Sequence, residues 1–146
     1  MPRVKLELPE NPVFTTEIPV RITDVNYGGH LGNDSLLSIL HEARVQFLGK
    51  YGFTESDIGG VGIIMTDAVL VYKAEVFYFD LLTIEIGISD LHALGADITY
   101  PVSAHAKEAA RAKTGIVFFH YATRKIAHAP KVFTDLLGPS HDQVRR

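Results

Sequence analysis

The segment DVNYGGHLGN occupies residues 24–33 and runs directly into DSLLSILHEARVQFLGKY, residues 34–51. The first stretch contains three glycines and two asparagines, a composition typical of a loop. In the second stretch apolar residues recur every three or four positions, at Leu36, Leu40, Ala43 and Phe47. This spacing predicts one long amphipathic helix from Asp34 to about Tyr51, with Gly52 as its C-terminal stop.

On either side of this unit, apolar and polar residues alternate with a period of two, which is typical of strands with one buried face. Before the loop, Glu17–Thr23 follows this pattern, and Pro19 predicts a position near a sheet edge. After the helix, 61–73 is predicted to be extended because it is rich in β-branched and apolar residues. Further extended segments are predicted at 82–89, 97–104 and 115–127, with a charged turn at 106–113. One helix set apart from five strands predicts an α+β domain with a mostly antiparallel sheet. The tail Pro130–Arg146 is expected to hold a short helix and then fray.

Length and composition exclude several classes of protein. The 146 residues fit a single domain, 1–146, and 47% of them are hydrophobic, enough for a sizeable core. The net charge of −3 gives no basic excess for nucleic acid, and the absence of cysteine excludes disulfides and thiolate metal sites. No stretch reads as a signal peptide or a membrane span, so we expect a cytoplasmic protein that does not bind membranes.

The last predicted strand carries apolar side chains on both of its faces. Ile116 and Phe118 alternate with Val117 and Phe119, whereas one helix can cover only one face of a sheet. A second subunit is therefore expected to cover the face that the helix leaves open, in a homodimer or a homotetramer.

The loop and the helix carry a family resemblance. Asp24-Val-Asn-Tyr-Gly-Gly-His-Leu-Gly-Asn33, followed by Glu42-Ala-Arg44, resembles the hotdog-fold acyl-CoA thioesterases, in their 4-hydroxybenzoyl-CoA thioesterase-like branch. The resemblance implies a hotdog fold, in which a curved antiparallel five-stranded sheet wraps a long central helix. It also implies active sites at subunit interfaces, where water hydrolyses an acyl-CoA or acyl-carrier thioester with no cofactor. No metal is predicted, because no cluster of residues has metal-ligand spacing.

The sequence departs from this family at the residue that usually supplies the catalytic carboxylate, which here is Asn26. An amide cannot act as a base, but it can orient a water or donate to a carbonyl. The base must then come from another acid, and Asp24, Asp34 and Glu42 are the candidates. Each has a structural alternative: a turn for Asp24, helix capping for Asp34 and an ion pair with Arg44 for Glu42.

The remaining candidate residues surround the same loop. His30 is predicted to bind substrate, donate to the developing oxyanion or orient a carboxylate. Free backbone N–H groups near Gly29, His30 and Leu31 are predicted to polarise the thioester carbonyl, helped by the helix dipole. Asn33 is expected at the helix start and Tyr27 beside an acyl pocket, both as substrate-binding residues. His41 and His120 are instead expected to be satisfied core or interface histidines.

Two other functions stay open on the sequence alone. Hotdog-fold hydratases and dehydratases of enoyl thioesters carry an Asp-x-Asn-x-x-His pattern, and here His30 follows Asp24 and Asn26 one residue too late. The third reading is a non-catalytic subunit that binds acyl thioesters, which Asn26 would permit.

Overall fold

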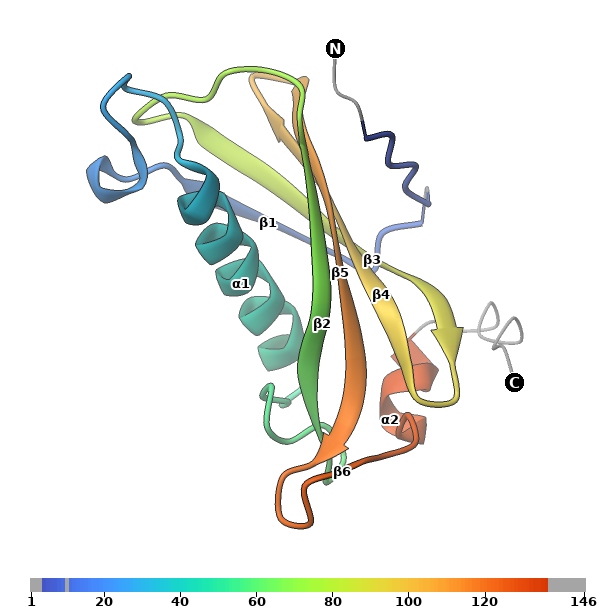
Figure 1. Ribbon diagram of the computed structural model, residues 1–146. Helices are drawn as coiled ribbons and strands as arrows, with labels where there is room; N and C mark the ends of the chain where they lie inside the picture. The colour runs from blue at the N-terminus through green and yellow to red at the C-terminus, as the bar shows by residue number, and fades with distance from the viewer. Residues whose placement is uncertain (1–3, 10, 137–146) are drawn as a thin grey trace.

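A single long helix crosses the concave side of a curved sheet in the computed structural model, which describes residues 4–9 and 11–136 (Figure 1). Helix α1 spans Asn33–Lys50, within one residue of the predicted limits at each end. The four apolar residues that predicted it are fully buried: Leu36, Leu40, Ala43 and Phe47. Gly52 follows the helix with a φ of 77°, which confirms it as the stop.

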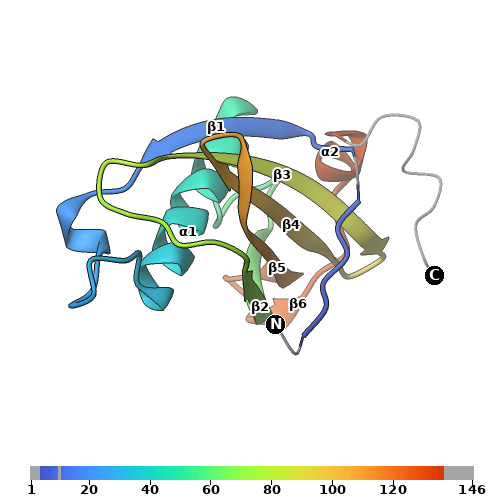
Figure 2. The ribbon, with the colours of Figure 1, turned by 90° about the horizontal axis from the view of Figure 1, so that it is seen from above.

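The sheet is antiparallel with the strand order β1-β3-β4-β5-β2, and it curves from β1 to β2 around α1 (Figure 2). The strands are β1 (Phe14–Pro19), β2 (Gly62–Tyr72), β3 (Leu81–His92), β4 (Gly95–Ala104), β5 (Lys107–His120) and β6 (Lys125–Ile126). The two-residue β6 pairs with β5 outside the main path, so the sheet has six strands rather than five. The predicted α+β architecture, a long helix wrapped by a curved antiparallel sheet, is confirmed. No helix in the described part of the chain is long and apolar enough to cross a membrane.

The first strand lies earlier in the sequence than predicted. It ends at Pro19, and a 3₁₀ turn, η1 (Ile22–Asp24), replaces the expected continuation to Thr23. Ile22 is therefore 62% exposed instead of buried. The carboxylate of Asp24 closes this turn by accepting the backbone N–H of Arg21 at 2.9 Å, a local bond that competes with strand pairing. Pro19 does lie in an edge strand, because β1 pairs only with β3.

The predicted charged turn at 106–113 is wrong. The chain reverses between β4 and β5 at His105 and Ala106, which have φ values of 54° and 62°, and β5 already begins at Lys107. Tight turns with positive φ are usually recognised in a sequence by glycine or asparagine, and neither is present here, so this turn could not be predicted. The last predicted strand also breaks after His120, and the chain returns as β6. The expected short helix of the tail is α2 (Lys131–Thr134), and the predicted fraying beyond Leu136 lies outside the described residues.

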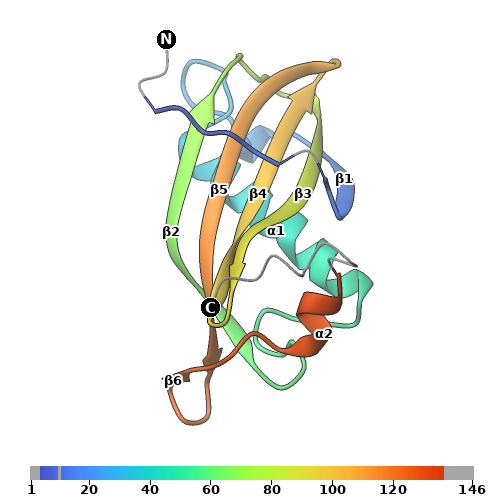
Figure 3. The same cartoon turned by 90° about the vertical axis from the view of Figure 1, so that its right-hand side faces the viewer.

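The convex face of the sheet is partly covered by the chain itself. Residues 4–9 cross this face, opposite α1 (Figure 3). The guanidinium of Arg111 on β5 holds the segment by donating from Nη1 to the carbonyl oxygen of Leu6 at 2.8 Å. Pro9 lies beside Gly87 and Thr99 of the sheet. The face that we expected a second subunit to cover thus receives part of its cover from the N-terminal segment.

Candidate active site

A cavity of about 330 Å³ opens at the start of α1. Four parts of the chain meet there: the loop before α1, the first turn of α1, the segment after β2, and the neighbouring ends of β4 and β5. Its lining consists of His30, Leu31, Leu36, Tyr72, Lys73, Ala74, Glu75, Val76, Val102, Ala109 and Ala110. An apolar floor with a few polar groups at its mouth is the usual form of a small-molecule site.

Glu75 is the only acid among the described residues that line this cavity. Its Oε1 lies 3.8 Å from Nε2 of His30, and both side chains are partly exposed. The His30 ring also packs edge-on against Phe77, with 5.2 Å between the ring centroids. An imidazole next to a carboxylate at the mouth of a cavity can exchange protons with a bound water. The sequence analysis did not find Glu75, because no periodicity marks it and only the fold brings it to His30.

The loop before α1 is joined to the segment after β2 by backbone hydrogen bonds. The N–H of Leu31 donates to the carbonyl of Val76 at 2.8 Å, and His30 forms an isolated bridge with Phe77. These bonds fix the position of His30 relative to Glu75, so the pair does not depend on long, freely rotating loops.

The predicted free amides of the loop are not free. Besides Leu31, the N–H of Gly29 donates to the carbonyl of Asn26 at 3.0 Å, and the N–H of His30 donates to the Asn26 Oδ1 at 3.3 Å. The prediction that these three groups polarise a carbonyl is therefore wrong, because each N–H already has an acceptor inside the chain.

Unpaired amides do occur one step later, in the first turn of α1. The first intrahelical bond runs from the Leu36 N–H to the Gly32 carbonyl at 3.0 Å. The N–H groups of Asn33, Asp34 and Ser35 precede it and have no acceptor within the helix. Together with the helix dipole they offer partial positive charge beside the cavity. The electrophilic end of the site is thus the helix start rather than the loop.

Asn26 shapes the loop. Its Oδ1 accepts the N–H of Gly28 at 3.0 Å as well as that of His30, the pattern of an Asx turn. Its side chain is exposed and does not line the cavity. Tyr27, at the tip of the same loop, is fully exposed and lies outside the lining too. For both residues, contact with a substrate stays a prediction.

Asp24 is buried and occupied. Its Oδ2 accepts the backbone N–H and the Nε of Arg21, at 2.9 and 3.2 Å, and its Oδ1 accepts the Nη2 at 3.2 Å. Its carbonyl accepts the Gly32 N–H at 2.9 Å, which holds the chain at the entrance to α1. The carboxylate therefore has a structural role in the turn, the alternative that the sequence left open for it.

Asp34 lies in the first turn of α1 and is not among the residues that line the cavity. Burial and, to a smaller extent, the negative charge of Asp34 raise the pKa of the Tyr72 phenol in the cavity wall. The Tyr72 hydroxyl in turn donates to the carbonyl of Asn33 at 3.5 Å, which links β2 to the helix start. Asp34 therefore acts electrostatically on a residue of the cavity wall without lining the cavity itself.

Glu42 points elsewhere. Its Oε2 accepts the Gln46 Nε2 at 2.8 Å, it is exposed, and it lines no described cavity. On an α-helix, a residue eight positions after Asp34 is rotated about 80° from it around the helix axis, whereas a residue seven positions after it is rotated only about 20°. His41, not Glu42, therefore continues the face of Asp34 along the helix.

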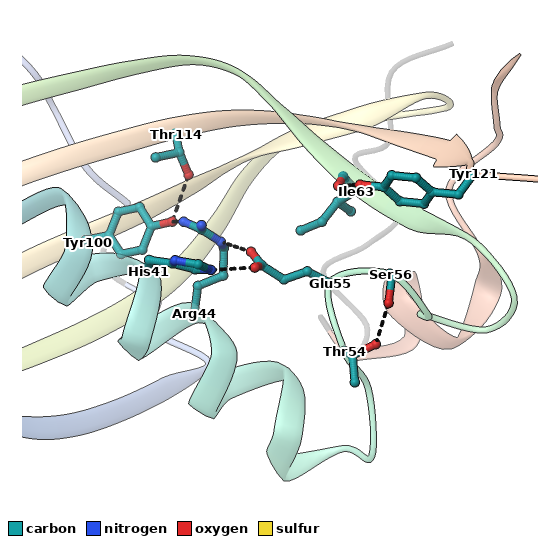
Figure 4. A network of polar contacts seen from close by, with 9 residues as sticks. All are labelled: His41, Arg44, Thr54, Glu55, Ser56, Ile63, Tyr100, Thr114 and Tyr121. Atoms are coloured by element: carbon teal, nitrogen blue, oxygen red, sulfur yellow. Dashed lines mark hydrogen bonds and ion pairs between the residues drawn. The ribbon is translucent and has the colours of Figure 1, made fainter. Parts of the chain in front are cut away.

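A second hollow, a groove of about 460 Å³, follows this helix face beside β2. Polar contacts connect its residues (Figure 4). The Glu55 carboxylate accepts the Nε of Arg44 at 2.5 Å and pairs with the Nε2 of His41 at 2.6 Å. Arg44 also donates from Nη1 to the Tyr100 hydroxyl at 3.0 Å, which lies 2.7 Å from the hydroxyl of Thr114. Arg44 thus pairs with Glu55 and not with Glu42.

Electrostatics keeps Glu55 and Arg44 of this network ionised. Burial favours the neutral form of Glu55, but the hydrogen bond and the charge of Arg44, with help from His41, outweigh it and lower the Glu55 pKa. Burial likewise acts to lower the Arg44 pKa, and its Tyr100 and Glu55 partners outweigh it, so this pKa is raised. His41, which we expected to be a satisfied core or interface residue, is more than half exposed at the groove. His120 is exposed as well.

Among the described residues, no three His, Asp or Glu side chains gather in a way that would hold a metal ion. Of the side chains that line the cavity, His30 and Glu75 can transfer protons, and the amides of the first turn of α1 can donate hydrogen bonds.

Comparison with known proteins agrees with this architecture. A family model described as the thioesterase-like superfamily matches residues 20–137, most of the chain. No curated protein matches the chain.

Solved structures are similar over most of their length. A 1,4-dihydroxy-2-naphthoyl-CoA thioesterase from Synechocystis is 24% identical, with a TM-score of 0.77 over 86% of this chain and 96% of the other. A DHNA-CoA thioesterase from Staphylococcus aureus is 20% identical, with a TM-score of 0.71 over 88% and 85%. A hypothetical protein from Staphylococcus aureus, solved in complex with CoA, is 13% identical, with a TM-score of 0.78 over 97% and 91%. At these identities the likeness concerns the fold, and it confirms the predicted hotdog fold.

Proposed function

Because the chain belongs to the thioesterase-like superfamily, a class of thioester hydrolases, we propose that it hydrolyses acyl-CoA thioesters in the cavity at the start of α1. The observation that carries the proposal is the position of Glu75: the only acid lining the described cavity, 3.8 Å from His30 and next to the first turn of α1. CoA is the proposed carrier because one neighbour of the same fold was solved with CoA bound.

Hydrolysis of a thioester needs a polarised carbonyl, a water and a base. In the proposed reaction, the amides of Asn33, Asp34 and Ser35 hold the carbonyl oxygen as it gains negative charge. Glu75 takes a proton from a water whose oxygen bonds to the carbonyl carbon. The carbon–sulfur bond then breaks, and the proton that Glu75 took passes through His30, 3.8 Å away, to the sulfur, which leaves as a free thiol. The acyl group leaves as the carboxylic acid, and Glu75 and His30 return to their starting states.

This assignment gives a physical reason for Asn26. The resemblance predicts a carboxylate on the loop before α1, but the loop residue here is an amide that accepts two backbone N–H groups. Glu75 reaches the cavity from the opposite wall, after β2. A carboxylate at position 75 would therefore supply the base that position 26 lacks, and Asp34, in the first turn of α1, is the second candidate base.

A homodimer or homotetramer, proposed from the sequence, has a free edge available. In the described part of the chain, β2 pairs on one side with β5 and has no strand on the other. Ile64 and Met65 on β2 are 37% and 50% exposed. A second copy that pairs along β2 would cover these side chains and close the space between α1 and β2. The cytoplasm remains the proposed location.

The structure gives less support to the hydratase alternative. That reaction uses an Asp and a His as an acid–base pair, but the Asp24 carboxylate is buried beneath Arg21 and lines no described cavity. Asp24 therefore cannot act with His30 without breaking the turn that it closes.

The decisive experiment measures release of free thiol from purified protein and a panel of short, long and aromatic acyl-CoA esters. Glu75→Gln should lower kcat by about 100-fold or more, the usual loss when a general base is removed. Glu42→Gln is the matched control, since it makes the same change on an exposed acid away from the cavity, and it should leave kcat unchanged. Binding of CoA esters with no thiol release from any of them would favour the non-catalytic binding subunit. Loss of an enoyl thioester without thiol release would favour the hydratase.

A further inference from the structure

An exposed pair of aromatic rings lies next to the mouth of the cavity. Phe77 packs edge-on against His30, and the next two residues, Tyr78 and Phe79, stack on each other. The centroids of the stacked rings lie 4.0 Å apart, and their planes differ by 26°. Two residues of chain separate the Cα atoms of Phe77 and Phe79 by at most about 7.6 Å. Phe79 is 79% exposed, so the ring face that Tyr78 does not cover is open to a ligand.

Hydrogen bonds hold this ring pair in one position. The Asp80 carboxylate accepts the N–H of Phe77 at 2.9 Å, and the N–H of Asp80 donates to the carbonyl of Phe77 at 3.1 Å. The N–H of Phe79 donates to the carbonyl of Val20 at 3.3 Å. His105 Nε2 lies 2.8 Å from the second carboxylate oxygen of Asp80. Residues 77–80 therefore form a tied turn, and a ligand that binds to the rings does not have to order a free loop.

Stability does not account for a phenylalanine at position 79. Its φ of 74° lies at the third position of the turn, where glycine or asparagine is favoured. The ring is exposed, so burial does not compensate for the strain. Strained residues of this kind cluster at sites that bind ligands. The combination of strain, exposure and stacking therefore marks Phe79 as a residue that contacts a ligand.

The cavity is too small for a whole acyl-CoA molecule. Its volume of about 330 Å³ lies at the lower end of the range for sites that hold one small molecule. Acyl-CoA consists of an acyl group, a pantetheine arm and a phosphorylated adenine nucleotide. With the thioester next to Glu75 and His30, the nucleotide has to find its contacts on the surface around the mouth.

The chemistry of this surface matches a nucleotide. A base has a flat π face and stacks on aromatic side chains, whichever base it is. Lys73 is an exposed member of the cavity lining and forms no ion pair within the described part of the chain. Its ammonium group can pair with a phosphate. A carrier protein presents the same pantetheine arm but has no base to stack on Phe79.

We propose that the open face of the Phe79 ring is the stacking site for the adenine base of acyl-CoA, and that Lys73 pairs with a phosphate between the base and the thioester. The inference rests on the proposed function, since it takes the thioester to lie in the cavity at the start of α1. It adds a binding site for the nucleotide, and it favours CoA over a carrier protein as the thioester carrier.

The test compares two thioesters of the same acyl group: the acyl-CoA and the acyl-pantetheine, which lacks the nucleotide. Phe79→Gly removes the ring at a position whose φ glycine adopts without strain, so the variant should fold. With acyl-CoA its KM should rise about fivefold or more at unchanged kcat, the lower end of what stacking of one base contributes. With acyl-pantetheine both constants should equal those of the parent. Phe79→Tyr keeps a ring and should retain the parent KM for acyl-CoA, whereas Lys73→Gln should raise it.

Ile126→Ala is the control for the loss of an exposed apolar side chain. Ile126 is 57% exposed on β6, at the other end of the molecule, and its variant should keep the parent KM for both substrates (Figure 1). An unchanged KM for acyl-CoA in Phe79→Gly, or an equal rise for both substrates, would overturn the inference and leave the proposed function standing. A rise found only with an acyl-carrier protein would assign the rings to a protein partner and overturn it too. No thiol release by the parent from any of these thioesters would overturn the proposed function together with the inference.

Discussion

His30 Nε2 lies 3.8 Å from Glu75 Oε1, and the two residues reach this distance from separate walls of the cavity. His30 is held by the loop before α1, and Glu75 follows β2, with Leu31 and Val76 joined by a backbone hydrogen bond between them. The proposed catalytic pair is therefore brought together by the packing of two segments rather than by a local motif.

If His30 and Glu75 act together, their substitutions should not add. We expect His30→Ala and Glu75→Gln each to lower kcat strongly, and the double variant to be little worse than Glu75→Gln alone, because the first change already breaks the unit. Thiol-release kinetics of the four proteins in the cycle measure the coupling. Additive losses in the logarithm of kcat would mean that the residues act independently.

Asn26 should respond differently to two substitutions. Asn26→Ala removes the acceptor of the Gly28 and His30 N–H groups and should lower thiol release about tenfold by releasing the loop that positions His30. Asn26→Asp keeps an oxygen acceptor at the same place and should retain the rate. A clear increase of the rate in Asn26→Asp would show instead that this position reaches the thioester.

Acid should weaken the network around Glu55. Its pKa is lower in the folded protein than the ordinary value of 4.5, because the bonds from Arg44 and His41 outweigh burial. A carboxyl with a lowered folded pKa contributes stability above its unfolded pKa and loses it as the pH falls through the folded value. Urea unfolding at neutral pH and at steps below pH 4.5 should show a falling free energy of unfolding.

Glu55→Gln provides the control for this pH dependence. The variant should be less stable at neutral pH, because Arg44 stays buried without its counter-charge. Its stability should also fall less steeply below pH 4.5 than that of the parent. An unchanged slope would assign the acid sensitivity to other carboxyls.

Phe79 occupies an unfavourable backbone conformation at an exposed turn. Its φ is 74°, its side chain is 79% exposed, and its ring stacks on Tyr78 at 4.0 Å. The left-handed region costs a residue with a Cβ roughly 1–2 kcal/mol, and an exposed ring pair returns roughly 0.5–1 kcal/mol. Phe79→Gly should therefore raise the free energy of unfolding by about 0.5–1 kcal/mol in urea denaturation. Phe79→Ala keeps the Cβ and should give no such gain.

Periodic patterns made most of the architecture predictable. The burial of Leu36, Leu40 and Phe47 follows from helical spacing, β2 follows from a run of β-branched and apolar residues, and β3 follows from alternation. The turn at His105 and Ala106 was missed because its positive φ values fall on residues that do not announce them. In such a hairpin the pairing of β4 with β5 decides the backbone conformation, and local sequence does not.

The site was less predictable, for a physical reason. The position of Asp34 in the first turn of α1 was predictable because helix starts have a local signature, but the partner of His30 depends on which strand ends beside it. The loop amides were expected to be free because a glycine-rich turn permits it, yet Asn26 and Val76 accept them. Sequence patterns predict where a backbone turns, whereas the acceptors of its N–H groups come from tertiary packing.

The strip of peptide formed by residues 4–9 has a consequence for how copies associate. Because Leu6 is hydrogen-bonded to Arg111, residues 4–9 cover part of the convex face of the sheet. Two copies that packed through their convex faces would first have to displace this segment. A strand of a second copy could pair along the free edge of β2 without displacing residues 4–9. Since an antiparallel union along one margin uses the same margin of both copies, it closes upon itself as a finite pair instead of propagating into a filament.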